Sequence, residues 1–149
     1  MYRGNLAVAV SAMSKLESVL RGMSRVPYRT AQVAAPRISG LLFEEFKQGR
    51  DPYGTPWEPI SPNTYRKVTK RRWPPLTDTR RLRDGSMATA MPGGISIRMG
   101  RPEFYFHQVG TVTMPARPIL PDRGWPRRWL DALNQSAASV VKQTLREGL

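Results

Sequence analysis

The sequence lacks cysteine altogether and contains a single histidine, His107. Without cysteine the chain has no disulfide framework, no thiolate nucleophile and no cysteine-ligated metal. No apolar run approaches the roughly 18 residues that a membrane-spanning helix needs. The apolar residues 6–10 have a faint likeness to a signal sequence, but polar residues soon cut this segment short. We therefore expect a soluble protein made inside the cell.

Acidic residues are few, and they are scattered along the chain. No group of histidine and carboxylate side chains has recognisable metal-ligand spacing. Glu44 and Glu45 are adjacent, so on a helix they point in different directions and do not form an acid–base pair. Neither a G-x-S-x-G motif nor a phosphate-binding glycine loop occurs. The sequence predicts no catalysis, no cofactor and no metal; an enzyme would require that His107→Ala abolish an activity while assembly stays intact.

Charge is strongly one-sided, because 24 Lys and Arg outnumber 11 Asp and Glu, for a formal net charge of +13. Such a chain is attracted to nucleic acid, anionic membranes or acidic protein surfaces, and salt weakens the attraction. A sequence-independent nucleic-acid-binding protein is therefore one hypothesis for the function. Steep loss of tight DNA binding with added salt would support it.

The chain length of 149 residues suits one domain spanning residues 1–149. Its 14 prolines and 12 glycines predict long irregular connections. Helical spacing of apolar residues predicts a first helix over residues 6–24, with one buried stripe, that ends before Pro27. That stripe comprises Leu6, Val10, Met13, Leu16, Leu20 and Met23.

A second helix is predicted over residues 28–48, where Pro36 either kinks the helix or begins a new one. From Ser86 the apolar period becomes two, and Pro92-Gly93-Gly94 supplies a turn, which predicts a β-hairpin with one buried face. Residues 104–106 suit a third strand or a short helix. Residues 125–148 return to helical spacing, with Trp129 widening a stripe of Leu130, Leu133, Ala137, Val140 or Val141, and Leu145. The fold class is α+β: N-terminal helices, a small antiparallel sheet and a C-terminal helix.

A proline-rich segment, residues 46–60, forces the chain to turn after the second helix. Asp51-Pro52-Tyr53-Gly54 has the composition of a β-turn. Trp57 follows in this stiff loop, and we expect its ring to act as an anchor pressed onto the domain.

Residues 61–85 carry eight Lys and Arg against two Asp and have no apolar period, so we expect an extended basic loop or arm, with a short helix near residues 63–70. Basic and aromatic side chains here could dock on acidic partners or stack on nucleic acid; the alternative is a solvated arm that orders only on a partner. The candidate interface residues in the arm are Arg66, Lys67, Lys70, Arg71, Arg72, Trp73, Arg80 and Arg81.

Four blocks in this order resemble the phage virion morphogenesis family, which includes the tail completion proteins. They are residues 51–57 (DPYGTPW), 76–82 (LTDTRRL) leading to Ser86, 105–110 (YFHQVG) and 115–120 (PARPIL). Arg80 stands where the family pattern has glycine, Ile119 stands for phenylalanine, and the tyrosine-to-histidine spacing is shorter. The signature residues in the first, third and fourth blocks are Asp51, Pro52, Gly54, Trp57, His107, Gln108, Gly110, Pro115 and Arg117.

The resemblance implies a structural protein of a tailed-phage virion, made in the host cytoplasm and located at the neck, that acts in tail completion and head-to-tail joining. It further implies a homo-oligomeric ring, expected to be a hexamer, that contacts the tail terminator or tube on one side and the connector on the other. The resemblance allows non-specific contact with DNA but does not require it, and it implies no contact with a membrane.

Two residues in the later blocks have alternative interpretations. Arg117 suits a bidentate carboxylate contact across a subunit boundary, or an intrachain pair that holds the loop to the sheet. Together with Trp57 it is a candidate interface residue. His107 suits a pH switch or, as we favour, a structural histidine bonded to a backbone carbonyl, and Gln108 has the same structural interpretation.

Overall fold

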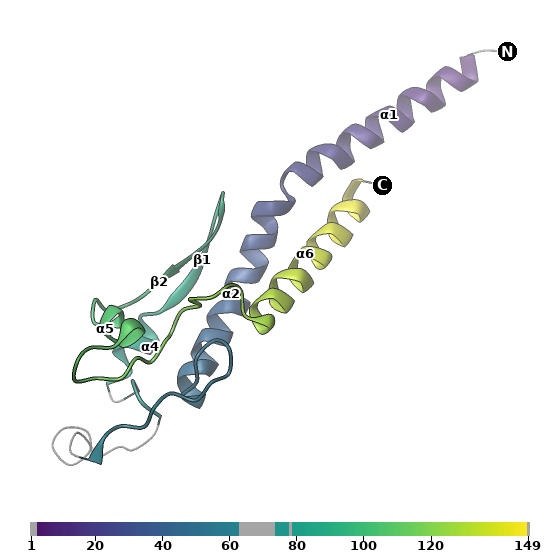
Figure 1. The fold of residues 1–149 in the computed structure, drawn as a ribbon. Coiled ribbons are helices and arrows are strands. Elements are labelled where there is room, and N and C mark those ends of the chain that lie inside the picture. Colours follow the sequence, from purple (N-terminus) through teal and green to yellow (C-terminus); the bar gives the residue numbers. More distant parts are fainter. Residues whose placement is uncertain (1–2, 63–73, 78, 149) are drawn as a thin grey trace.

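The computed structural model describes residues 3–62, 74–77 and 79–148 (Figure 1). Two long helices come first, α1 (Arg3–Ser24) and α2 (Val26–Gln48). The short helix α4 (Arg81–Asp84), the strands β1 (Met87–Met91) and β2 (Gly94–Arg98), and the short helix α5 (Phe104–Val109) follow. The long helix α6 (Arg127–Gly148) comes last. The described part of the chain therefore has the α+β class predicted from the sequence.

Helix α2 lies at the centre, packed against α6 on one side and the hairpin on the other (Figure 1). Its buried face includes Ala34, Ile38, Leu42 and Phe46, which recur at helical spacing. Opposite them lie Trp129 and Val140 of α6, both buried. Helix α2 ends at Gly49, whose φ of 64° is left-handed and whose N–H bonds to carbonyls of the last turn.

Both prolines of α2 are accommodated within one helix. Pro27 lies in the first turn, where its missing N–H is no loss, so α2 begins two residues earlier than predicted. Pro36 lies inside the helix, which continues through it, and the new-helix alternative is wrong. Pro36 is on the exposed side, where water can reach the carbonyl that loses its partner.

The predicted hairpin is present, with one face toward α2. Ala88 pairs with Ile97 and Ala90 with Ile95, and these side chains point inward. The Ser39 hydroxyl on α2 accepts a 2.8 Å hydrogen bond from the backbone N–H of Ala88. The edge of β1 is thereby satisfied by the helix instead of by another strand.

The predicted burial of the α1 stripe is wrong. Met13, Leu16 and Leu20 are 70%, 58% and 61% exposed. The helix extends away from the body of the molecule (Figure 1), so its first turns have no neighbouring element in the described chain. Amphipathic spacing identified the apolar face, but it could not say whether the covering surface belongs to this chain.

The stripe predicted for α6 is displaced around the helix. Its buried residues are Trp129, Ser136, Val140 and Thr144. Leu130 and Leu145, predicted to be buried, are 39% and 41% exposed. Ser136 can be buried because its hydroxyl donates a hydrogen bond to the Ala132 carbonyl one turn earlier.

The end of the predicted basic arm is part of the folded body. Pro75, Thr77 and Leu82 are buried, and residues 81–84 form α4. An extended arm is therefore wrong for this portion, since isolated buried residues between charged ones gave no period to detect. Residues 104–106 belong to helix α5 rather than a third strand. The predicted helix near residues 63–70 and the candidates Arg66, Lys67, Lys70, Arg71, Arg72 and Trp73 lie outside the described residues.

Candidate functional site

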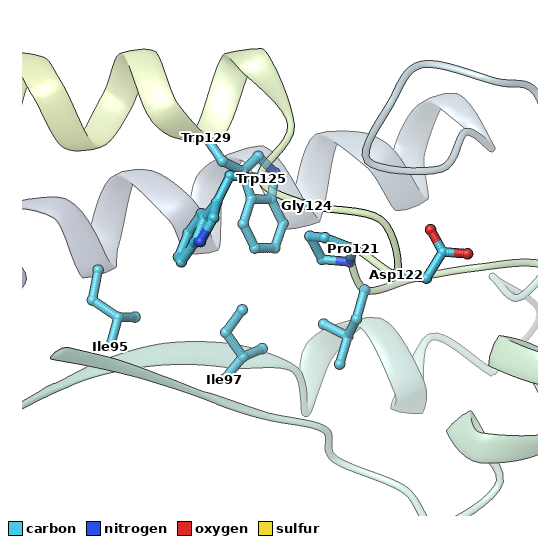
Figure 2. Close-up of a pocket in the computed structure, with 8 residues that line it drawn as sticks. Ile95, Ile97, Pro121, Asp122, Gly124, Trp125 and Trp129 are labelled. Carbon is cyan, nitrogen blue, oxygen red and sulfur yellow. The ribbon is translucent and has the colours of Figure 1, made fainter. Parts of the chain in front are cut away.

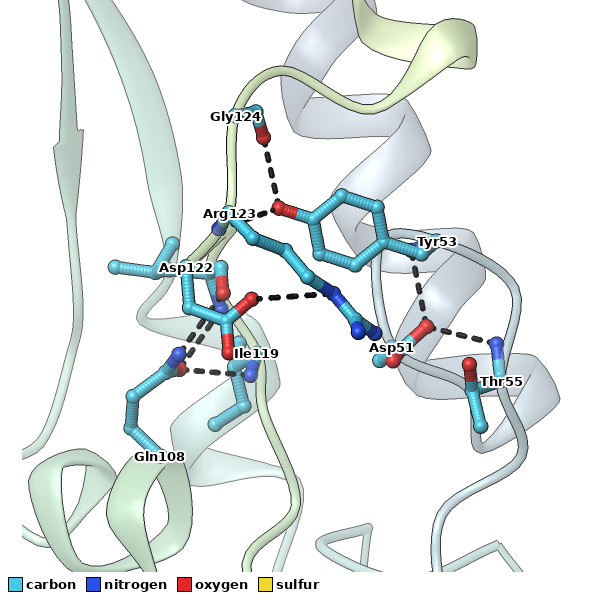
Figure 3. A network of polar contacts seen from close by, with 9 residues as sticks. Asp51, Tyr53, Thr55, Gln108, Ile119, Asp122, Arg123 and Gly124 are labelled. Atoms are coloured by element: carbon cyan, nitrogen blue, oxygen red, sulfur yellow. Dashed lines mark hydrogen bonds and ion pairs between the residues drawn. The ribbon is translucent and has the colours of Figure 1, made fainter.

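The Asp51 turn is built as predicted. The Gly54 N–H bonds to the Asp51 carbonyl at 3.0 Å, which closes the β-turn. The Asp51 side chain is buried, and its Oδ1 accepts hydrogen bonds from the backbone N–H groups of Tyr53 at 2.9 Å and Thr55 at 2.7 Å (Figure 3). Pro52 is also buried, and Gly54 adopts a φ of 93°. A charged acceptor bonded to two backbone donors makes this turn rigid.

Trp57 anchors the proline loop in the core. Its ring is 3% exposed and packs edge-on against Phe46, with centroids 5.6 Å apart. Its indole Nε1 donates a 2.8 Å hydrogen bond to the carbonyl of Pro118. Trp57 thus joins the first resemblance block to the last. It was predicted to be an interface residue, but its side chain lies inside the molecule and not on the surface.

Arg117 joins the same two segments from the other side. Its Nε donates to the Glu58 carbonyl at 2.8 Å, and its Nη2 donates to the Pro59 carbonyl at 3.1 Å. The side chain is buried, and burial lowers the pKa of the guanidinium. The contact is intrachain, and the intrachain alternative was wrong about its partner, because Arg117 binds backbone carbonyls of the proline loop rather than the sheet.

Gln108 joins α5 to the last block. Its Oε1 accepts hydrogen bonds from the N–H groups of Ile119 at 2.8 Å and Leu120 at 2.9 Å, and its Nε2 donates to the Leu120 carbonyl at 2.8 Å (Figure 3). The amide therefore pairs with the backbone as a neighbouring strand would. Ile119, which follows Pro118, is fully buried in the core as a result.

His107 lies at the same junction. Its backbone carbonyl accepts a 2.6 Å hydrogen bond from the Arg117 N–H. Its side chain is half-buried, and Nδ1 has no hydrogen-bond partner among the described residues. Burial, and then the charge of Arg117, lowers the pKa of the imidazole, partly offset by Glu103. The lowered pKa favours the neutral imidazole, and the predicted side-chain hydrogen bond to a carbonyl is not made through Nδ1.

Gly110 allows the close approach between α5 and the last block. Its φ is 75°, and a Cβ there would lie 2.8 Å from the backbone nitrogen of Ala116. Glycine is needed at this position for both reasons. Pro115, one residue before Ala116, begins the extended segment that contains Arg117 and Ile119.

Tyr53 makes a contact that the sequence did not predict. Its hydroxyl donates to the Gly124 carbonyl at 2.7 Å and accepts from the Arg123 N–H at 2.9 Å (Figure 3). The Arg123 guanidinium lies over the Tyr53 ring, 4.8 Å from its centroid. Tyrosine at the third position of a turn gave no signal for a partner about seventy residues away.

The interlocked segments define one structural unit, which we call the joint: residues 51–59, 107–110 and 115–120. The joint brings together all of the signature residues. Arg80 and Arg81, by contrast, are exposed near α4. Arg80 has a left-handed φ of 59°. The predicted residues thus divide into an interior set that holds loops together and an exposed basic pair outside it.

A second feature beside the joint is an apolar groove of about 440 Å³. Figure 2 shows Ile95 and Ile97 of the hairpin on one side and Trp125 and Trp129 on the other. The two indole rings meet edge-on with centroids 6.3 Å apart, and Trp125 is half exposed. The lining suits an apolar side chain better than a polar ligand.

Glu45 is a buried carboxyl that sequence reasoning missed. Its Oε1 accepts a 2.8 Å hydrogen bond from Trp129 Nε1, while Oε2 has no partner among the described residues. Burial raises the pKa of Glu45 to about 7, although the Trp129 hydrogen bond and the charge of Arg128 oppose the shift. A signal existed, since Glu45 falls three residues after Leu42 and seven after Ile38 on the buried face of α2.

Two further features of the described residues are their capacity to hold a metal ion and to cross a membrane. Among these residues, no group of three or more His, Asp or Glu side chains is placed to hold a metal ion. No described helix is long and apolar enough to cross a membrane. Comparisons of the chain with family models, with curated proteins and with solved structures find no match.

Proposed function

We propose that this chain is a structural protein of a tailed-phage virion that acts in tail completion and head-to-tail joining. In this proposal it forms a ring at the neck, contacts the tail terminator or tube on one side and the connector on the other, and catalyses no reaction. The observation that carries the proposal is the joint. Three sequence blocks, spread over about seventy residues, meet there through hydrogen bonds of Trp57, Gln108 and Arg117.

The hydrogen bonds in the joint give the signature residues a structural role. Each signature residue that binds does so to backbone groups: Asp51 to two N–H groups, Gln108 to three groups, and Arg117 to two carbonyls. Such residues fix the geometry of the loops that they join. A motif of this kind is typical of a scaffold whose function depends on surfaces rather than on reacting groups.

Arg80 adds a second support. It occupies the position at which the family pattern has glycine, and its φ of 59° is one that glycine adopts without strain. The backbone conformation therefore agrees with the family pattern where the residue type does not. This agreement is independent of the hydrogen bonds in the joint.

The competing proposal, a sequence-independent nucleic-acid-binding protein, is favoured by the net charge of +13 and by exposed arginines such as Arg80 and Arg81. Fluorescence titration with duplex and single-stranded DNA at increasing salt separates the two. Tight binding with a steep salt dependence would favour it over the virion role. Weak binding that disappears at moderate salt is expected if the charge serves protein docking.

The experiment that tests the virion role is removal of the gene from the phage or prophage that encodes it. Electron microscopy of the lysate is expected to show filled heads and completed tails that are not joined, and a plasmid copy of the gene is expected to restore infectivity. Intact infectious particles from the deletion would overturn the proposal.

A further inference from the structure

Helix α1 presents an apolar side that nothing in the described chain covers. Met13, Leu16 and Leu20 are each more than half exposed on it. The contact of α1 with α6 uses a different side, where Gly22 lies against Thr144 and Val19 against Gly148. The exposed side is therefore available while α1 remains attached to the body of the protein.

The spacing along this side is that of a coiled coil. Met13 and Leu20 are seven residues apart, and Ala9, Leu16 and Met23 form a second series with the same seven-residue step. Leu6 extends the first series in the sequence. Apolar residues that alternate at steps of three and four, here over about two and a half heptads, form the seam by which one helix pairs with another helix. We call Ala9, Met13, Leu16, Leu20 and Met23 the α1 seam.

Charge indicates what kind of helix pairs with it. No residue of the seam is charged, and between residues 4 and 20 the only charges are Lys15 and Glu17, which cancel. In a chain with a net charge of +13, another copy meets little charge repulsion on this surface. A helix that binds anionic lipid would carry several Lys and Arg on its polar side, whereas that side of α1 carries Ser11, Ser14 and Ser18, and Lys15 is the one basic residue between residues 4 and 20.

We propose that the α1 seam pairs with the α1 seam of a second copy of this chain, so that α1 is an intersubunit coiled coil. Because every copy carries the same seam, each α1 finds a matching apolar face on another subunit. The proposal adds a contact to the self-assembly proposed above, but its argument does not need a virion role. Helix α1 then projects beyond α6 because its partner lies in another subunit (Figure 1).

The test compares two double variants of the full chain by sedimentation equilibrium. Met13→Lys/Leu20→Lys places two charges in the seam. Ser11→Lys/Ser18→Lys places the same charges, with the same spacing, on exposed positions of the polar side. Circular dichroism of each variant checks that helix content is retained. The seam variant is expected to raise the dissociation constant of the oligomer by about 100-fold or more. The control variant is expected to keep a dissociation constant near that of the wild type.

Three results would overturn the pairing: a wild-type chain that is monomeric throughout, a seam variant that associates like the wild type, or a wild-type chain whose seam serves only to bind vesicles of anionic lipid. Failure of this inference can be distinguished from failure of the proposed function. Rings that persist in the seam variant would exclude the seam as the contact while leaving the neck role in place. An oligomer that depends on the seam, in a protein whose gene the phage does not need, would support the pairing and exclude the neck role.

Discussion

Trp129 Nε1 donates a 2.8 Å hydrogen bond to Glu45 Oε1 between two helices, α6 and α2, at a point where both side chains are buried. The indole has only this one donor, and the carboxyl is its acceptor. Oε2 of Glu45 has no partner among the described residues. This relationship places a titratable group at the main helix contact of the protein.

Stability is therefore expected to fall as pH rises through neutrality. The pKa of Glu45 in the folded chain is about 7, above its ordinary value of 4.5, so the folded chain binds the proton more tightly than the unfolded chain. The stabilising contribution is fully present below pH 4.5 and is lost as pH rises through about 7. Glu45→Gln keeps an acceptor for Trp129 and removes the titration. It should match the wild type near pH 5 and exceed its free energy of unfolding by roughly 2 kcal/mol at pH 8.5.

Urea unfolding at both pH values measures this difference. Glu44→Gln, an exposed neighbour whose carboxylate pairs with Arg128 at 3.2 Å, is the matched control and should show no such divergence from the wild type. Parallel pH curves for Glu45→Gln and the wild type would contradict the assignment.

Arg117→Lys tests the joint. A lysine ammonium is a point charge and cannot reproduce the two N–H groups that reach Glu58 and Pro59. We expect a loss of about 1–3 kcal/mol in the free energy of unfolding, because a buried charge and two carbonyls lose well-aligned hydrogen bonds. The control is Arg127→Lys at an exposed position of α6, which should change the urea midpoint little. Equal midpoints for the two variants would show that Arg117 does not hold the loops together.

Gly100→Ala tests the contact at the base of the hairpin. A Cβ at Gly100 would lie 2.6 Å from the carbonyl carbon of Gly85, and backbone cannot move aside as a side chain can. The expected cost is roughly 2–4 kcal/mol. Gly93→Ala is the control, since a Cβ there meets nothing within 4 Å. A thermal melt of Gly100→Ala that coincides with that of Gly93→Ala would refute the close packing.

Arg80→Gly is expected to stabilise the protein. At a φ of 59° arginine is strained and glycine is not, which is worth about 0.5–1 kcal/mol in favour of glycine. Arg80→Ala removes the same charge without relieving the strain, so the comparison of the two variants isolates the backbone effect. If both variants unfold at the same denaturant concentration, the left-handed conformation has no energetic consequence.

The sequence predicted those features that depend on local chemistry. Proline, glycine and aspartate predicted the Asp51 turn, and period two with a glycine-containing turn predicted the hairpin. Helix positions followed from apolar spacing to within a few residues. These signals act over a few residues, which is why one sequence is enough to detect them.

What the sequence did not predict depends on partners that are distant along the chain. Nothing near Tyr53 indicated the Gly124 carbonyl, and nothing near Arg117 indicated the carbonyls of Glu58 and Pro59. The exposure of Leu16 had a different cause. An apolar stripe has the same spacing whether its cover comes from its own chain or from another.

Cryo-electron microscopy of finished particles tests the central claim most directly, by locating this chain in the virion. The account predicts a ring of its subunits at the head–tail junction, with the joint inside each subunit and α1 paired between subunits. Particles whose neck is fully explained by other proteins, with no copy of this chain present, would contradict it.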